Sequence, residues 1–242
     1  HKGDSAATNP LPKPKLSPDI GKAVRGGYQG PVSQMLPRDR FFECITSGSP
    51  VNWYFASYPW ASVKDQFIKY TYPTAGCPEV HMIWTDAPCW IGCWGDGQSN
   101  IEAIRNPKIE FVLTQHPWME NGCLYSDIIL PINTKLEEED IGTDIQNGQF
   151  CLIFPEPKCI EPLGESKSDF EAVGEVAKKL GIYDNFTEGK TDGEWIRAGF
   201  EGAGVQEMIS WEDFTEKGYF VVPTASDWEQ DLVGMIKFVK NP

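Results

Sequence analysis

Three short apolar segments, each followed by a polar loop, constrain the fold of this chain more than any other feature. They are EVHMIW (79–84), IEFVLT (109–114) and DIILP (127–131). Runs that are apolar throughout are typical of strands buried on both faces. Helical signals occur after the first run, and a short helix is expected across 118–125 before the third. Strand, helix, strand in this order requires crossovers between parallel strands, so the sequence predicts an α/β fold: an open, mostly parallel sheet with flanking helices in three layers.

Capping patterns predict where the helices of this fold begin. Ser99 and Ser168 each have a glutamate three residues later, which matches the capping box. The helix after Ser168 has a periodic apolar face and is expected to stop at Gly181. Ser210 is expected to cap a shorter helix within SWEDFTEKG (210–218).

Composition divides the chain into three parts. Residues 1–30 are polar and spaced by prolines, which predicts an extended arm or linker. Residues 31–225 carry the apolar runs and helix signals and are expected to form one α/β domain. Residues 226–242 are expected to lead towards a further domain. The first residue is not Met and no apolar signal-peptide core follows it, so we interpret the chain as an internal piece of a larger protein.

Charge, hydropathy and cysteine spacing exclude several classes of function. The formal net charge of -14 argues against nucleic acid as a partner, because phosphate binding needs clustered Lys and Arg. No run of 18 apolar residues is present, so no membrane span is predicted. The seven cysteines have no repeated spacing, and three residues rather than two separate Cys89 from Cys93. Buried free thiols are therefore favoured over a metal site.

Ligands of an open parallel sheet bind outside the carboxyl ends of the strands. Three loops meet this condition: residues 85–98, 115–121 and 131–142. His116 directly follows the second strand and could be a base, a metal ligand or a hydrogen-bond partner of a bound ligand. His81 lies inside the first run and is expected to be a core residue. The acidic run 137–140 is a solvated face, the first turn of a helix or a set of acceptors at the crevice.

Glycine and tryptophan are frequent near the same loops. GCWGDG (92–97) precedes a predicted helix, so its amides could receive a phosphate. Its order differs from the dinucleotide fingerprint, and a plain turn is favoured. Trp84, Trp90, Trp94 and Trp118 are expected to pack in the interior, although a crevice for a flat heterocycle would also use them. No nucleophile-elbow pattern is present, so a hydrolytic triad is not expected.

Four motifs at these loops follow one recognisable order. TDAP (85–88) stands where a Gly-Gly-Asn-Pro-like turn is usual and keeps only the proline. QHPW (115–118) matches an acid-Pro-aromatic loop, and SDIILP (126–131) matches Ala-Asp-Ile-Val-Leu-Pro. LEEED (136–140) matches Leu-Glu-Arg-x-Asp, with Glu138 where Arg is usual. Together these motifs resemble the third domain of the dimethyl-sulfoxide-reductase family of molybdenum and tungsten enzymes.

A narrower resemblance lies in two later segments, KCIEPLGESKSDFE (158–171) and WEDFTEKGYFVVP (211–223). Both are similar to the large subunits of pyrogallol-phloroglucinol transhydroxylases and related catechol dehydroxylases. The resemblance implies a molybdenum oxidoreductase or hydroxyl transferase of anaerobic metabolism that acts on a polyhydroxylated aromatic. It also implies a cytoplasmic enzyme; a periplasmic one would need a twin-arginine signal ahead of this segment.

The resemblance implies that this chain holds one guanosine arm of a bis(molybdopterin guanine dinucleotide) cofactor carrying Mo or W. Backbone groups of 85–88 and 115–118 would line the nucleotide, and Glu137 or Asp140 would accept from a guanine N–H or a ribose hydroxyl. The implied cofactor-binding residues are Thr85, Asp86, Ala87, Pro88, Asn100, Gln115, His116, Pro117, Trp118, Glu137 and Asp140.

Catalytic residues, the metal ligand and a 4Fe-4S cluster are expected in other domains of the same subunit, so this segment is expected to be inactive by itself. The implied partners are the cofactor, those domains and an iron-sulfur electron-transfer subunit. Two alternatives stay open. One is a structural or interaction module of the same fold without nucleotide binding, which the lost Gly-Gly-Asn turn favours. The other is a family member that reduces sulfoxides or oxyanions, or oxidises formate.

Overall fold

The computed structural model describes residues 34, 36, 40–55, 68–143, 152–202 and 204–223. These residues form two compact units, each described by itself. The parallel-sheet unit comprises the described residues from 34 to 134 together with 162–176, and the antiparallel-sheet unit comprises those of 135–161 and 177–223. The predicted arm, the predicted C-terminal connection and both predicted boundaries of the α/β domain lie outside the described residues.

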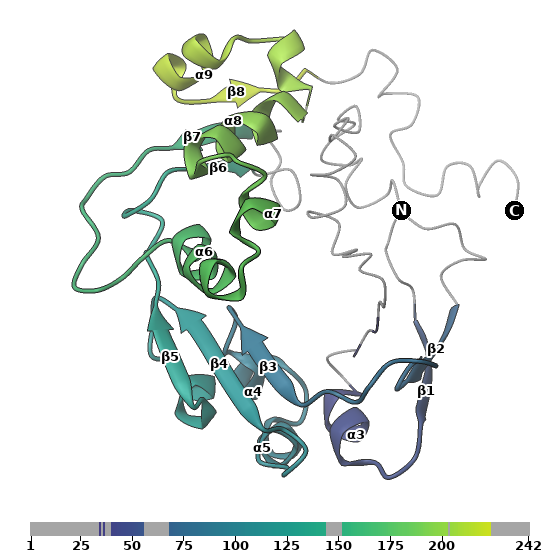
Figure 1. The fold of residues 1–242 in the computed structure, drawn as a ribbon. Helices are drawn as coiled ribbons and strands as arrows, with labels where there is room; N and C mark the ends of the chain where they lie inside the picture. Colours follow the sequence, from purple (N-terminus) through teal and green to yellow (C-terminus); the bar gives the residue numbers. More distant parts are fainter. Residues whose placement is uncertain are drawn as a thin grey trace, which may run out of the picture. The chain divides into compact units, whose positions relative to one another are not determined.

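Three parallel strands form the sheet that the sequence predicts. They are β3 (Met82–Thr85), β4 (Phe111–His116) and β5 (Ile128–Pro131), in the order β3-β4-β5. Their arrows point the same way in Figure 1. The central strand β4 is buried along most of its length, whereas the edge strands expose Met82 and Ile128. The α/β class with a parallel sheet and flanking helices is therefore confirmed.

Short helices make the crossovers and cover one face of this sheet. The connection from β3 to β4 contains α4 (Trp90–Cys93) and α5 (Gly97–Ile104), and the next connection contains the 3-10 helix η3 (Asn121–Tyr125). Trp90 and Ile104 pack against Val112 of β4 in one apolar cluster. Burying a side chain of this kind stabilises a fold by about 1.5–3 kcal/mol, so this cluster fixes the helices on the sheet.

A smaller antiparallel pair completes the parallel-sheet unit. The helix α3 (Phe41–Thr46) leads into β1 (Val51–Phe55), which pairs with β2 (Ile68–Tyr72). Their core contains Cys44, Val51, Trp53 and Tyr72. The Tyr72 hydroxyl accepts a hydrogen bond from the Val80 amide at 2.8 Å. Burial of the ring is the main reason why the pKa of Tyr72 is raised.

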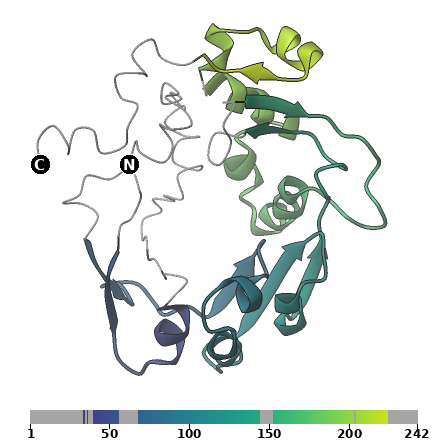
Figure 2. The same ribbon diagram turned by 180° about the vertical axis from the view of Figure 1, so that it is seen from behind.

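The antiparallel-sheet unit contains pairings that the sequence analysis did not predict. Its strands are β6 (Asp140–Thr143), β7 (Leu152–Glu156) and β8 (Phe220–Val221), in the order β6-β7-β8. Its helices are α7 (Tyr183–Thr187), α8 (Asp192–Gly202), η4 (Val205–Glu207) and α9 (Trp211–Lys217). Figure 2 shows from behind how α8 and α9 lie with these strands.

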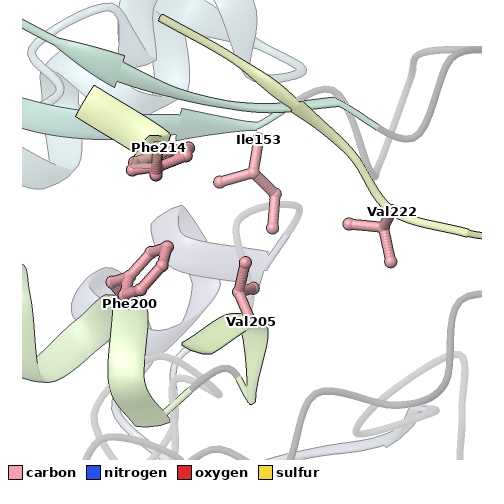
Figure 3. Packing of buried hydrophobic residues seen from close by; sticks show 5 residues of the cluster. All are labelled: Ile153, Phe200, Val205, Phe214 and Val222. Carbon is pink, nitrogen blue, oxygen red and sulfur yellow. The ribbon is translucent and has the colours of Figure 1, made fainter. Parts of the chain in front are cut away.

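The core of this second unit is aromatic and aliphatic (Figure 3). Phe200 of α8 and Phe214 of α9 point toward one another, with ring centroids 4.9 Å apart. Ile153, Val205 and Val222 complete the buried cluster. The long sequence separation between these residues explains why local patterns did not reveal the cluster. None of the described helices is long and apolar enough to cross a membrane.

Two of the three predicted helix caps are confirmed. Ser168 Oγ accepts from the Glu171 amide at 3.1 Å, and a Glu171 carboxylate oxygen accepts from the Ser168 amide at 3.0 Å, ahead of α6 (Asp169–Leu180). Gly181 ends this helix with φ +72°. Ser210 caps α9 by accepting from the amide of Asp213.

Two predictions about single residues were wrong. Ser99 lies inside α5, whose cap is Asp96. Sequence spacing favoured Ser99, but Asp96 adopts a left-handed φ of 57° that lets the helix start earlier. His81 is not a core residue: it precedes β3, its side chain is 51% exposed, and its Nδ1 lies 3.1 Å from a carboxylate oxygen of Glu110.

Replacing the cap of α6 tests this account of the fold. Ser168→Ala removes the acceptor of the Glu171 amide and should cost about 1 kcal/mol of local stability. Ser166→Ala is the control, because the Ser166 hydroxyl donates to a loop carbonyl and caps no helix; it should change stability by about 0.5 kcal/mol or less. Hydrogen exchange of the α6 amides measures both effects, and equal effects would contradict the assigned cap.

Candidate functional site

A hydrogen bond joins the carboxyl ends of β3 and β4. Thr85 and Thr114 are paired in register, and both chains then leave the sheet. Nδ1 of His116 lies 2.9 Å from the backbone carbonyl oxygen of Asp86. Since a carbonyl oxygen can only accept, Nδ1 carries the proton. In the neutral ring this tautomer leaves the lone pair on Nε2.

The second ring nitrogen of His116 is buried and makes no hydrogen bond to any described residue. Oε1 of Glu120 lies 3.5 Å from this nitrogen. The lone pair of the neutral ring and the carboxylate are both acceptors, so neither satisfies the other. A buried acceptor without a donor is unfavourable, and a ligand carrying an N–H or O–H group would satisfy it.

Gln115, the neighbour of His116 in β4, has a structural role. Its side chain is 6% exposed, and its amide oxygen accepts from Trp84 Nε1 at 2.6 Å. Its amide nitrogen donates to the carboxylate of Asp169 at the start of α6. Both ends of the side chain are therefore hydrogen-bonded within the protein.

The loop after β3 is held by close packing. Ala87 donates its amide to the Thr85 hydroxyl at 3.1 Å, and Asp86 and Ala87 are exposed. Pro88 is fully buried, and its carbonyl oxygen lies against Gly122 of η3. A Cβ at Gly122 would lie 2.0 Å from that oxygen, so only glycine fits there.

The side chain of Asn100 is also buried and hydrogen-bonded within the protein. Its side chain is 2% exposed and donates to the carbonyl of Gly95 at 3.1 Å. This bond fastens the glycine-rich loop to α5. The cap of that helix is Asp96, which accepts from the Ser99 amide at 3.2 Å. Hydrogen bonds from the hydroxyl and the amide of Ser99 lower the pKa of Asp96, so a carboxylate already occupies the helix terminus where a phosphate would bind.

The loop after β4 presents apolar groups at the surface. Pro117 is half-buried, whereas Trp118 and Met119 are 64% and 67% exposed. The Trp118 carbonyl accepts from the Glu120 amide at 2.9 Å, which closes a tight turn. Of the four tryptophans expected to pack in the interior, Trp90 is buried and Trp118 is not.

The remaining predicted site residues, Glu137 and Asp140, belong to the antiparallel-sheet unit. Glu137 is 5% exposed. Asp140 forms an ion pair with Lys135 and accepts from the Ile141 amide at 2.8 Å. Burial alone would lower the pKa of Lys135, but the hydrogen bond and charge of Asp140, together with Glu138, raise it. The Asp140 carboxylate is thus already compensated by a cation.

Four of the six described cysteines depart from the prediction of buried thiols. Cys44 and Cys123 are buried, Cys77 and Cys89 are partly exposed, and the other two, Cys93 and Cys159, are exposed. Within the described ranges, no group of three or more His, Cys, Asp or Glu side chains is arranged to hold a metal ion. The candidate site is the pair of strand ends around His116, where the buried Nε2 has no hydrogen-bond partner among the described residues.

Comparison with known proteins identifies the family. Residues 90–179 match the sequence model of the family described as molybdopterin oxidoreductase. The chain is 34% identical over 202 residues to the pyrogallol hydroxytransferase large subunit of Pelobacter acidigallici, covering 79% of this chain and 23% of that protein. This chain belongs to the molybdopterin oxidoreductase family.

Other known proteins match a smaller part of the chain. Dimethyl sulfoxide reductase DmsA of Escherichia coli (strain K12) is 30% identical over 145 residues, which is 58% of this chain and 18% of that protein. Acetylene hydratase from Pelobacter acetylenicus superposes with a TM-score of 0.48 and 16% identity, covering 62% of this chain and 20% of that one. The chain thus spans about a quarter or less of the length of these proteins.

Membership in the molybdopterin oxidoreductase family implies a molybdopterin-type cofactor with molybdenum. The matched range includes α4, α5, β4 and β5 and begins just after TDAP (85–88). The turn that departs from the family motif therefore lies outside the matched range. Sequence reasoning did not single out Glu120 or Gly122, and only their position beside His116 and Pro88 reveals their part in the site.

The contact between Gly122 and Pro88 predicts a strong effect of one added methyl group. Gly122→Ala should displace the 85–88 loop and cost about 1–3 kcal/mol, because the backbone oxygen cannot move aside alone. Gly95→Ala is the matched control, since nothing lies within 4 Å of its Cβ position. Hydrogen exchange of residues 86–92 would measure both, and an unperturbed loop in Gly122→Ala would contradict the packing.

The charged cap of α5 predicts a dependence on pH. Because the pKa of folded Asp96 is lowered, its stabilisation is present above the usual aspartate range and is lost as the pH falls through the lower folded value. The protection of the Ser99 amide from hydrogen exchange should decrease over the same pH range. Asp96→Asn should keep the cap and remove the dependence. The Asp213 amide, which donates to the Ser210 hydroxyl, serves as internal reference. If the Ser99 amide loses protection over the same pH range in Asp96→Asn, Asp96 is not the titrating cap.

Proposed function

We propose that the ends of β3 and β4 hold the guanosine end of a bis(molybdopterin guanine dinucleotide) cofactor. The whole enzyme would be a hydroxyl-transferring or dehydroxylating oxidoreductase that acts on a polyhydroxylated aromatic. Family membership and the likeness to a pyrogallol hydroxytransferase support this proposal. The single observation that carries the guanosine site is the orphaned Nε2 of His116.

The chemistry of the strand ends fits a guanine base. Guanine presents N–H groups on its pairing edge, including the N2 amino group. The strand ends offer acceptors: the Nε2 lone pair of His116 and the carboxylate of Glu120, 3.5 Å apart. Exposed Trp118 supplies a flat ring close by in sequence. An acceptor-rich site selects the donors of the base, which also explains how a chain of net charge -14 would bind a nucleotide.

The pyrophosphate is not assigned to the glycine-rich loop. Asp96 already accepts from the Ser99 amide at the start of α5, and a second anion there would be repelled. This favours the interpretation of residues 92–97 as a plain turn. When bound, the cofactor supplies the redox chemistry through its metal, and the residues of this chain orient its nucleotide end.

Residues and groups beyond the strand ends are also given roles. Glu137 or Asp140, both in the antiparallel-sheet unit, is proposed to accept a hydrogen bond from the guanosine. Asn100 and Gln115 are proposed to act by holding the loops, with the Gln115 backbone facing the ligand. The 4Fe-4S cluster, the catalytic residues and an electron-transfer subunit are proposed to lie elsewhere in a cytoplasmic complex.

A structural module without nucleotide binding is the second candidate. The side-chain amides of Asn100 and Gln115 favour it, because both are hydrogen-bonded within the protein and not directed to a ligand. In that case Nε2 of His116 would face another part of the protein. The two candidates differ in what happens to the cofactor when His116 is replaced.

Removing the imidazole tests the guanosine site. In the complete enzyme, His116→Ala should release the guanine nucleotide about 2–10 times faster, because one hydrogen bond contributes about 0.5–1.5 kcal/mol. Guanine nucleotide retained per chain after timed gel filtration measures this release.

His81→Ala is the matched control for this experiment. It also removes an imidazole beside a glutamate, but at an exposed position outside the site. The control should retain the nucleotide like the unmodified enzyme. If a folded His116→Ala enzyme also does so, the strand ends do not hold the guanosine and the structural module is favoured.

A further inference from the structure

Two cysteines lie one helical turn apart beside the candidate site. Cys89 is the residue before α4 and Cys93 is the last residue of that helix. The Cys93 amide donates to the Cys89 carbonyl at 2.8 Å. Residues four apart in a helix face the same side, with Cβ atoms about 5–6 Å apart. Cys93 is exposed and Cys89 is partly exposed, so both thiols are accessible to small molecules.

The nearby Cys93 side chain affects the ionisation of Cys89. The pKa of Cys89 is raised, mainly because its thiol is hydrogen-bonded to the side chain of Cys93, with burial as the next cause. Two other described cysteines bond to backbone carbonyls instead: Cys123 to that of Trp118 and Cys159 to that of Pro157. The Cys89 and Cys93 side chains are thus two oxidisable groups one helical turn apart.

We propose that Cys89 and Cys93 form a redox-active dithiol that a hydroperoxide converts reversibly to a disulfide. The exposed Cys93 thiolate attacks the peroxide; the O–O bond breaks, hydroxide leaves, and a sulfenic acid forms on Cys93. The Cys89 sulfur then attacks the Cys93 sulfur, the S–O bond breaks and water leaves. Two electrons and two thiol protons pass to the hydroperoxide, and hydrogen peroxide as oxidant yields two water molecules.

Geometry makes this disulfide labile rather than structural. A disulfide needs Cβ atoms about 3.5–4.5 Å apart, so the turn must tighten by about 1–2 Å. Cys89 can move because it lies at the cap, with ψ 6° outside the helical range. Strained and exposed disulfides are easily reduced, which suits a reversible modification.

Metal binding explains the Cys89–Cys93 pair less well than oxidation does. Two thiols alone leave a metal ion short of ligands, since structural zinc sites have four. No group of three or more His, Cys, Asp or Glu side chains in the described part of the chain could hold a metal. Oxidation requires only the two sulfur atoms and the named oxidant.

Formation of the disulfide would shift backbone next to the candidate site. Cys89 directly follows Pro88, whose carbonyl is pressed against Gly122. Tightening of the Cys89–Cys93 turn therefore shifts the end of the 85–88 loop. This consequence does not depend on which ligand the loop binds.

Peptide mapping of the complete, fully reduced protein tests the dithiol. The probe is one equivalent of hydrogen peroxide, followed by alkylation of the remaining thiols and digestion with chymotrypsin. Cleavage after Trp84, Trp90 and Trp94 separates TDAPCW (85–90) from IGCW (91–94). The proposal predicts that these two peptides are joined, lighter by two hydrogen atoms than their sum, and separated again by dithiothreitol, with two free thiols lost per chain.

Single variants identify the order of the steps. In Cys89→Ser the Cys93 sulfenic acid should persist and be trapped by dimedone, because the resolving thiol is gone. Cys159→Ser, which removes an exposed thiol elsewhere, should still form the linked peptides. If Cys93 of the unmodified protein is overoxidised without linkage, or links to Cys77 instead, the proposal is overturned.

Discussion

Two neighbouring residues at the carboxyl end of β4 hold the candidate site together. Successive side chains of a strand point to opposite faces, so Gln115 and His116 act on different partners. Gln115 bonds to Trp84 of β3 and to Asp169 at the start of α6. His116 bonds to the carbonyl of Asp86 in the loop after β3. The shape of the strand ends therefore depends on hydrogen bonds that converge on one central strand.

The sequence was sufficient for the elements that local patterns encode. Apolar runs located the three parallel strands, within three residues at each boundary. The capping box at Ser168 and the cap at Ser210 predicted two helix starts because those hydrogen bonds join residues only three apart. The rule that ligands bind at the carboxyl ends of parallel strands predicted that 85–88 and 115–118 lie together.

Other features depended on contacts that sequence spacing does not encode. The cap of α5 was missed because Asp96 adopts a left-handed conformation that is uncommon for any residue except glycine. The role of Gln115 appeared only when Asp169, 54 residues away, was found beside it. The orphaned nitrogen of His116 likewise follows from the fold, since it depends on which ring atom faces the Asp86 carbonyl.

The central claim is that the ends of β3 and β4 present acceptors to a guanosine. The structure of the complete enzyme with its cofactor tests this most directly, through the contacts of His116 Nε2. The account predicts an N–H or O–H group of the guanosine within hydrogen-bond distance of that nitrogen. A guanosine bound elsewhere, with His116 Nε2 satisfied by water or by another part of the protein, would contradict it.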